Sequence, residues 1–415
     1  MRVAVIGSGI SGLAAAYYLS RRHEVSVFEK DSRLGGHTHT VTVESSRGPL
    51  AVDTGFIVHN DRTYPNLVKL LAELGVATQP SDMSFGVACR QTGFEYSSRG
   101  LKGFFAQRAN LARLSQHRLL WEILRFNREA PKLLHDPDVS TLTLGDVMQR
   151  GRFPALFRER YLYPMASAVW SMSTKAIEAF PALTLVRFFQ NHGMLGVNTH
   201  PQWRVIRGGS MQYLAPIIAP YKDRIFTGAA IHSIGRDASG VTLRFLDRPS
   251  VSFDQVVFAC HGNQVLPLLE NPSDTERDIM GRFTTSRNEV CLHTDSSWLP
   301  KRAQARAAWN YSLGSEPGAP ATVTYHMNRL QSLNVAEDYC VTLNPNGGID
   351  PEKVLRRIEY YHPLYNSDAV QAQTRWSEIS GANRTHFCGA YWAYGFHEDG
   401  LNSALRVARS LGVEC

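Results

Sequence analysis

The chain has 415 residues, of which 43% are hydrophobic and 20% are charged, and its formal net charge is +7. This composition is typical of a globular protein with room for two domains. No run of eighteen apolar residues predicts a membrane-spanning helix, and the N-terminus lacks the features of a signal peptide. The six scattered cysteines form no Cys-x-x-Cys pair, so we expect free thiols in a cytoplasmic protein rather than disulfides or a zinc site.

The N-terminal residues carry a dinucleotide-binding pattern. Val3 to Ile6 predict a short strand, which is followed by Gly7-Ser8-Gly9-Ile10-Ser11-Gly12, an Ala-rich helix to about Leu19, and a second strand in EVSVFEK (24–30). A lone G-x-G-x-x-G motif is weak evidence, but the order strand, glycine turn, helix and strand makes it specific. The alternative is a glycine turn that binds no ligand.

Each glycine of the motif has a predicted physical role. Gly7 permits the tight turn, Gly9 lets the backbone approach a pyrophosphate, and Gly12 lets helix and strand pack closely. The helix that Ile10 and Ser11 open would then direct its free N–H groups at the phosphates.

A second glycine pair follows the second strand. Glu29 is placed to accept hydrogen bonds from an unphosphorylated ribose, and Lys30 comes directly after it. Arg33-Leu34-Gly35-Gly36-His37-Thr38 would bring more backbone against an extended dinucleotide, with Arg33 pairing with phosphates. No second G-x-G-x-x-G follows a strand downstream, so the sequence favours FAD as the sole cofactor over NAD.

The positive charge is concentrated between Arg90 and Lys132, where nine Lys or Arg residues meet three Glu. Within this segment apolar residues recur at helical spacing among arginines. Such a helix lies either on anionic lipid, at the inner face of the membrane, or with its charged face in solvent and its apolar face on its own domain. Nucleic acid is not an expected partner, since no recognition motif accompanies the charge.

The glycine motifs together resemble the flavoprotein superfamily that contains monoamine oxidases, protoporphyrinogen oxidase and phytoene desaturases. Longer segments are most similar to the flavin-oxidase-like N-terminal region of plant cyclopropane fatty acid synthases and to stand-alone bacterial proteins of that group. These segments include residues 52–88, YLYPMASAVWSMS (161–173), residues 191–214 and the closing GAYWAYGFHEDGL (389–401).

The resemblance implies an α/β fold in which a Rossmann-like FAD-binding domain of the amine-oxidase type is interleaved with an α+β substrate domain. Residues 1–85, 204–284 and 376–415 would form the FAD-binding domain. Residues 86–203, mainly helical, and 285–375 would form the substrate domain. Within the FAD-binding domain, alternation of apolar and polar residues predicts a hairpin that turns at Asp237 to Gly240.

The resemblance also extends the cofactor site. It implies backbone contacts near the flavin at residues 53–56, adenine contact at Ile231, and N–H groups near Gly400 and Leu401 that point at the flavin. The complete predicted cofactor set is Gly7, Gly9, Ile10, Ser11, Gly12, Glu29, Lys30, Arg33, Gly35, Gly36, His37, Thr38, Asp53, Thr54, Gly55, Phe56, Ile231, Ala259, Gly389, Phe396, Asp399, Gly400 and Leu401.

The predicted catalytic residues are His397, Glu398 and Tyr394. An imidazole beside the flavin is suited to proton transfer because its ordinary pKa is near neutrality, although a structural histidine fits as well. Glu398 or Asp399 could instead cap the last helix. Weaker candidates for the same cavity are His59, Asn60, Arg62, Tyr64, Trp309, Asn310, Tyr325 and His326, whereas Trp170, Phe180, Phe188 and Phe189 are expected in the core.

Two departures from the amine oxidases matter. Cys388 precedes the closing segment, but no cysteine lies within it, so FAD is expected to be bound non-covalently. The lysine that several amine oxidases hold near the flavin has no clear match, and Lys301 is more typical of an exposed loop residue. No H-E-x-x-H motif predicts a metal site.

The sequence therefore predicts an FAD-dependent oxidoreductase that removes a hydride from a hydrophobic substrate. A fatty acyl chain of a membrane lipid is the first choice, because the similar plant proteins belong to cyclopropane lipid methylation. Two alternatives stay open: an FAD-dependent amine or amino-acid oxidase, and a non-catalytic flavin-binding partner of a lipid methyltransferase.

Overall fold

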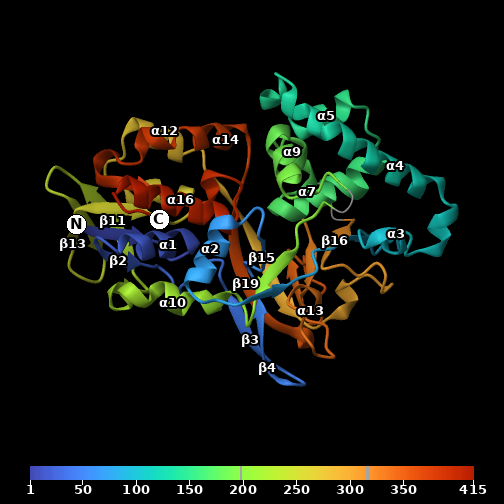
Figure 1. The fold of residues 1–415 in the computed structure, drawn as a ribbon, viewed down its shortest axis with the longest axis horizontal. Helices are drawn as coiled ribbons and strands as arrows, with labels where there is room; N and C mark the ends of the chain where they lie inside the picture. Colours follow the sequence, from blue (N-terminus) through green and yellow to red (C-terminus); the bar gives the residue numbers. More distant parts are fainter. Residues whose placement is uncertain (197–198, 315–317) are drawn as a thin grey trace.

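The structure is a computed structural model that describes residues 1–196, 199–314 and 318–415, and the chain folds into two lobes (Figure 1). The lobe that carries both termini is built on a five-stranded parallel sheet. Its strands, in order across the sheet, are β10 (Ile225–Phe226), β2 (Glu24–Phe28), β1 (Arg2–Ile6), β14 (Gln255–Phe258) and β20 (Thr385–Phe387). The apolar run Val3–Ile6 is buried between β2 and β14, as expected for a central parallel strand covered on both faces.

A three-stranded antiparallel sheet accompanies this lobe. It consists of β11 (Ile231–Arg236), β12 (Val241–Phe245) and β13 (Val251–Phe253). The predicted hairpin turn is confirmed, because the Asp237 N–H donates to the Gly240 carbonyl at 3.0 Å.

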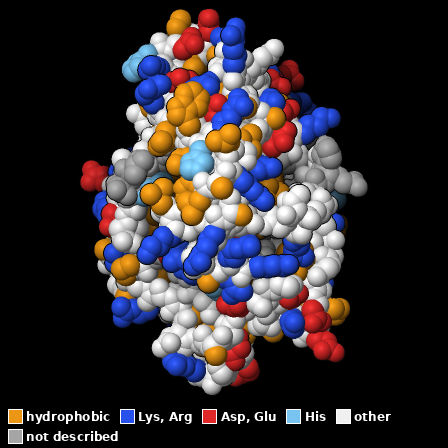
Figure 2. All heavy atoms as spheres, turned by 90° about the vertical axis from the view of Figure 1, so that its right-hand side faces the viewer, with side chains coloured by type: hydrophobic (Ala, Val, Ile, Leu, Met, Phe, Trp, Pro, Cys, Tyr) orange, Lys and Arg blue, Asp and Glu red, His pale blue; other side chains and the backbone are white. Residues whose placement is uncertain are grey.

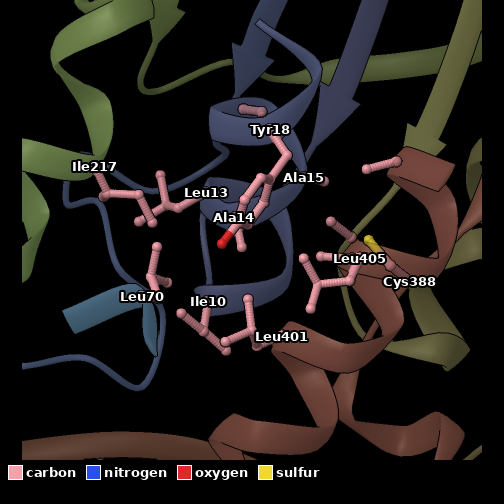
Figure 3. Close-up of a cluster of buried hydrophobic side chains, with 14 of the residues drawn as sticks. Ile10, Leu13, Ala14, Ala15, Tyr18, Leu70, Ile217, Cys388, Leu401 and Leu405 are labelled. Carbon is pink, nitrogen blue, oxygen red and sulfur yellow. The ribbon is translucent and has the colours of Figure 1, made fainter. Parts of the chain in front are cut away.

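The predicted Ala-rich helix is α1 (Ile10–Leu19), and it is the centre of the first lobe's core. Ile217 of α10 (Leu214–Ile218), Leu70 of α2 (Pro65–Glu73), and Leu401 and Leu405 of α16 (His397–Ser410) surround it (Figure 3). The remaining helices of this lobe are α11 (Val265–Leu268), α12 (Asp274–Met280), α14 (Ser367–Thr374) and α15 (Trp376–Ile379).

The second lobe contains a seven-stranded sheet that is antiparallel except for one parallel pair, β16 with β7. In order across the sheet its strands are β19 (Val354–Pro363), β15 (Thr285–His293), β18 (Cys340–Leu343), β17 (Val323–His326), β16 (Trp309–Leu313), β7 (Phe85–Cys89) and β8 (Glu95–Ser97). The stretch from residue 86 was expected to be mainly helical, so β7 and β8 are additions that the sequence did not indicate. Both strands are short, and their residues show little alternation of apolar and polar side chains.

Helices cover one end of this sheet. They are α3 (Gly100–Phe104), α4 (Leu114–Glu129), α5 (Leu144–Arg150), α6 (Ala155–Phe157), a π-helical turn (Arg158–Leu162), α7 (Tyr163–Trp170), α8 (Thr174–Glu178) and α9 (Ala182–Asn191). The short helix α13 (Met327–Leu330) lies away from them and contacts β17 and β18 (Figure 1). The helices from α4 to α9 share an aromatic core that includes the four predicted core residues Trp170, Phe180, Phe188 and Phe189. Of the helices in the described parts of the chain, none combines the length and apolar character needed to span a bilayer.

Two small sheets complete the fold. The hairpin β3 (Thr40–Ser45) and β4 (Gly48–Asp53) follows the second glycine pair. The strands β5 (Val58–Asn60), β9 (Trp203–Ile206) and β6 (Thr78–Pro80) pair antiparallel.

The last helix begins at His397, and this changes the interpretation of Gly400. Because α16 starts at His397, the Gly400 N–H donates to the Phe396 carbonyl at 3.0 Å within the first turn. A Cβ at Gly400 would lie 2.8 Å from both the Ile10 side chain and the Ser11 hydroxyl oxygen. Gly400 therefore serves the contact between α16 and α1, and its N–H, predicted to face the flavin, is used within the helix. The predicted flavin contact of the Leu401 N–H stays a prediction.

Replacing Gly400 with alanine should destabilise the fold by about 1–3 kcal/mol, because the added methyl group overpacks the contact with α1. The free energy of unfolding in urea measures this. Arg409→Ala, on the exposed side of the same helix, should change it by less than about 0.5 kcal/mol. Equal stability of the Gly400→Ala variant and the unmodified chain would contradict the packing role.

Candidate functional site

A cavity of about 2170 Å³ extends from the glycine turn after β1 to helices α4 and α7 of the second lobe. Four segments that line it are residues 6–11, 28–31, 54–58 and 389–391. Pockets for single small ligands measure about 300–1,000 Å³. The cavity therefore has room for a large cofactor and a second molecule beside it.

The glycine turn forms an open concavity at one end of the cavity. Gly7 has φ +107°, and a Cβ there would lie 2.9 Å from the Ala259 carbonyl oxygen, so only glycine fits. A Cβ at Gly12 would overlap the Gly7 carbonyl oxygen, which confirms the predicted close contact of helix and strand. At Gly9, which begins α1 without a side-chain cap, a Cβ would meet no atom within 4 Å. The first N–H groups of α1 are thus available to an anion at this end.

Glu29 lies at the same end, as predicted. Its carboxylate is buried and accepts hydrogen bonds from the Ser8 N–H at 2.9 Å, the Ser8 hydroxyl at 2.7 Å and the Asp31 N–H at 3.0 Å. Glu29 therefore fixes the glycine turn against the end of β2. Lys30, exposed, follows it on the cavity rim.

Arg33 has a role that the sequence did not indicate. Its guanidinium donates to the carbonyls of Leu34 at 3.0 Å, Gly36 at 2.7 Å and Thr38 at 3.1 Å. Arg33 thus holds the loop in place with N–H groups that were expected to pair with phosphates. A Cβ at Gly36 would lie 3.1 Å from the Gly9 Cα, so the second glycine pair packs on the first glycine turn.

His397 lies in the cavity, stacked on Phe56 with ring centroids 3.6 Å apart. Its Nε2 is 3.1 Å from the hydroxyl oxygen of Thr38, which also shares a hydrogen bond with the Tyr213 hydroxyl. Burial, with a smaller effect of His59, lowers the pKa of His397 to about 3. The ring is therefore neutral near pH 7, and the expectation of a proton donor that titrates near neutrality is corrected.

Glu398 points away from the large cavity. Its carboxylate accepts hydrogen bonds from the backbone N–H groups of Asn66 at 3.0 Å and Leu67 at 2.9 Å. These are the second and third residues of α2, whose N-cap residue Tyr64 makes no side-chain capping bond. Glu398 therefore caps a neighbouring helix, and we remove it from the catalytic set.

Asp399 caps its own helix. Its side chain accepts a hydrogen bond from the Phe396 N–H at 2.9 Å, which confirms the capping interpretation rather than a cofactor contact. Both acids line a separate cavity of about 520 Å³ beside the N-terminus of α2. Burial raises the pKa of Asp399 to about 7.

Asp53 is also structural. It is fully buried, and one oxygen accepts hydrogen bonds from the Thr40 hydroxyl at 2.6 Å and the Ser210 N–H at 2.8 Å. Burial raises its pKa to about 6 despite these bonds. Of residues 53–56, only Thr54, Gly55 and Phe56 reach the cavity.

Most of the predicted cofactor residues line the large cavity. Those that do are Gly7, Gly9, Ile10, Ser11, Glu29, Lys30, Arg33, Gly36, His37, Thr54, Gly55, Phe56, Ile231, Ala259, Gly389 and Phe396. Those that do not are Gly12, Gly35, Thr38, Asp53, Asp399, Gly400 and Leu401. Thr38 and Gly35 hold the loop together instead, because the Thr38 N–H donates to the Gly35 carbonyl at 2.9 Å.

The other candidates divide as well. Cavity-lining residues among them are Tyr64, Trp170, Phe188, Trp309, Tyr325 and Tyr394, so two of the predicted core aromatics also face the cavity. His59, Asn60, Arg62, Asn310 and His326 do not line it. Lys301 is exposed on a loop away from the cavity, and Cys388 is buried outside it. All six cysteines are free.

Sequence reasoning missed a group of rings around His37. His37 stacks on Tyr360 with ring centroids 4.8 Å apart, and the rings of His362 and His261 lie 5.3 and 6.0 Å away. Burial lowers the pKa of His261 and of His362 to about 4. His261 comes three residues after the end of β14 at Phe258, and this position near a parallel-strand end is the signal that could have identified it.

Comparison with known proteins decides the family. The model of the flavin-containing amine oxidoreductases matches residues 10–334. The chain belongs to this family. The predicted superfamily, its α/β fold and its flavin cofactor are thereby confirmed.

Individual relatives of this family are distant. A putative flavin-containing monoamine oxidase, AofH of Mycobacterium tuberculosis, is 27% identical over 248 residues, which are 58% of this chain and 53% of that protein. The chain thus spans about half the length of this relative. Among solved structures, putrescine oxidase bound to putrescine has a TM-score of 0.72 at 16% identity and covers 99% of both chains. A fatty acid isomerase of P. acnes that produces CLA has a TM-score of 0.71 at 14% identity, with the same coverage.

The cavity fits the family's flavin cofactor. Gly9 leaves open space for a pyrophosphate beside free amide groups, and Glu29 lies at the end of β2 next to it. The Nε2 atom of His37 and the hydroxyl of Tyr391 are buried without hydrogen-bond partners, and both residues line the cavity. Such unpartnered polar atoms are costly unless a bound group satisfies them.

Replacing Glu398 with glutamine should lower the free energy of unfolding by about 1–2 kcal/mol, because the cap of α2 is weakened. Urea unfolding measures the change, with Glu414→Gln as an exposed control. Substrate turnover per folded molecule should stay the same. Lost turnover at unchanged stability would instead return Glu398 to the catalytic set.

Acid should destabilise the site through its buried neutral histidines. Between about pH 4 and pH 6.5 the unfolded chain binds a proton at His362 that the folded chain does not, so this contribution is full above pH 6.5 and is lost as the pH falls. In His362→Gln the stability loss between pH 7.5 and pH 5 should be smaller by about 1–2 kcal/mol.

Urea unfolding of both proteins at the two pH values checks this expectation. Met165→Leu, which changes a cavity residue without a titrating group, should keep the pH dependence of the unmodified chain. The same pH dependence in His362→Gln would show that the ring is not held neutral by burial.

Proposed function

We propose that the protein is an FAD-dependent oxidoreductase that removes a hydride from a fatty acyl chain. The observation that carries the proposal is the apolar arm of the cavity in the second lobe. The residues that line this arm are Phe104, Leu120, Ile123, Leu124, Tyr161, Met165, Ala168 and Val169. An arm of this character excludes water and accepts an alkyl chain.

The acidic residues that line the cavity lie outside the apolar arm, at the glycine turn, or are bonded to other residues of the chain. Glu29 and Asp31 are at the glycine turn. Asp82 accepts a hydrogen bond from the Ser84 N–H at 2.9 Å and faces Arg329 at 3.3 Å, and Glu359 pairs with Arg287. Within the described residues, no acid that lines the apolar arm is free to bind an ammonium group, which favours an uncharged chain over an amine.

The cofactor would be held by the glycine turn, Glu29, the loop of Gly36 and His37, and the backbone at Gly55 and Phe56. When bound, FAD supplies the acceptor for two electrons and a hydride. Tyr394 and His397 line the same cavity. We propose that His397, kept neutral and hydrogen-bonded to Thr38, orients polar atoms at the reacting end without adding charge. Cys388 lies outside the cavity, which supports non-covalent FAD.

Amine oxidation is the second candidate. The relative AofH and the solved putrescine oxidase are named for amine oxidation. The aromatic rings of Trp170, Phe188 and Phe396, which pack together in the cavity wall, could also contact a cation. A third proposal, a flavin-binding partner of a lipid methyltransferase, requires FAD binding without turnover.

The anaerobic visible spectrum of the flavin-loaded protein distinguishes these functions. Dispersed unsaturated or methyl-branched acyl lipids should bleach the flavin absorbance, whereas putrescine and other small amines should not. Rapid bleaching by amines alone would establish the second candidate. No bleaching by either class would leave a binding role.

A charge in the apolar arm should select against an acyl chain. Ile123→Glu, on the cavity side of α4, should lower kcat/KM for the acyl substrate at least about tenfold, because a carboxylate would be buried against the alkyl chain. Ile123→Leu is the matched control and should keep most of the activity. Unchanged kinetics of Ile123→Glu would show that the substrate does not occupy this arm.

A further inference from the structure

One face of the second lobe has an unusual concentration of exposed apolar side chains. Among the described residues ten large hydrophobic side chains are exposed, and five of them lie between residues 101 and 124. They are Leu101 (68% exposed), Leu111 (58%), Leu114 (86%), Trp121 (57%) and Leu124 (48%). Single exposed apolar residues are ordinary, but a cluster of this kind marks an interaction surface.

Cations outnumber anions in this cluster. Residues 99–124 contain five Lys or Arg residues, namely Arg99, Lys102, Arg108, Arg113 and Arg118, and one acid, Glu122, which is buried. All five are exposed, and in the described parts of the chain only Arg118 approaches an acid, Glu122 at 4.0 Å. Figure 2 shows the side of the molecule that carries α3 and α4, with hydrophobic side chains gathered among those of Lys and Arg. We call the five apolar and five basic residues the α3–α4 surface.

The α3–α4 surface is continuous with the large cavity. Arg99, Leu101 and Leu124 belong to this surface and also line the cavity. The next residues inward along α4, Leu120 and Ile123, line the apolar arm. The cavity therefore opens within the surface rather than beside it.

We propose that the α3–α4 surface docks on the anionic face of a phospholipid bilayer, with the mouth of the cavity against the lipid. Exposed Trp and Leu side chains suit the boundary between headgroups and acyl chains, and exposed Lys and Arg side chains suit anionic headgroups. A second copy of the chain is a poorer occupant, since a two-fold contact would oppose two sets of five cations. The consequence that an acyl chain enters the arm directly from the membrane rests on the proposed function; the docking itself does not.

Flotation of the flavin-loaded protein with vesicles tests the docking. We expect the protein to float with vesicles that contain 40% phosphatidylglycerol and to bind pure phosphatidylcholine vesicles at least about tenfold more weakly, with binding reduced by high salt. The variant Leu114→Glu/Trp121→Glu should lose at least about tenfold in affinity for the anionic vesicles. Neither residue lines the cavity, so its flavin spectrum and its turnover of detergent-dispersed substrate should be retained.

Leu246→Glu is the matched control, because Leu246 is 76% exposed just after β12 in the other lobe. It should float like the unmodified protein. Failure of the unmodified protein to bind anionic vesicles, or equal binding by Leu114→Glu/Trp121→Glu, would overturn the proposal. A dimer that this variant dissociates in sedimentation, without vesicle binding, would overturn it in favour of self-association. Vesicle binding without flavin bleaching by acyl lipids would refute the proposed function and leave the docking intact.

Discussion

The site depends on how closely backbone segments approach one another around the N-terminus of α1. Gly7 bends the chain back from β1, Gly12 brings the helix against that bend, and Gly36 places a second loop on Gly9. From the far end of the chain, Gly400 packs on the same turn of α1. A side chain at any of these positions would hold two segments apart. The concavity that faces the cofactor exists because four glycines make these contacts possible.

Around this backbone frame, several charged side chains hold separate parts of the protein together. Arg33, Asp53 and Glu398 each use their charged group to tie loops or a helix end together. Imidazoles and phenols at the cavity, such as those of His362, His397 and Tyr360, are held in their neutral forms by burial, while charged side chains including Glu29, Lys30 and Asp82 also line it. The neutral rings contribute hydrogen bonds and shape to the cavity without adding charge.

The parts of the fold and site that could be predicted are those with local sequence patterns. The first strand, the glycine motif and α1 follow from one continuous stretch, and the hairpin turn at Asp237 follows from alternation. The role of Glu398 could not be predicted, because its partners Asn66 and Leu67 are more than 300 residues away along the chain. Likewise, nothing local indicates that His261 and His362 meet at His37. Long-range side-chain contacts leave no periodic pattern, so only a structure reveals them.

The order of strands in the five-stranded sheet has a consequence for how the protein is made. Its central strand, β1, is at the start of the chain, but its neighbour β14 begins at Gln255 and the edge strand β20 ends at Phe387. Contacts of such high sequence separation form slowly and late. During synthesis, β1 and α1 leave the ribosome long before α16, so the face of α1 that Leu401 and Leu405 cover stays exposed until α16 follows. The last helix thus decides when this face of α1 is protected from aggregation.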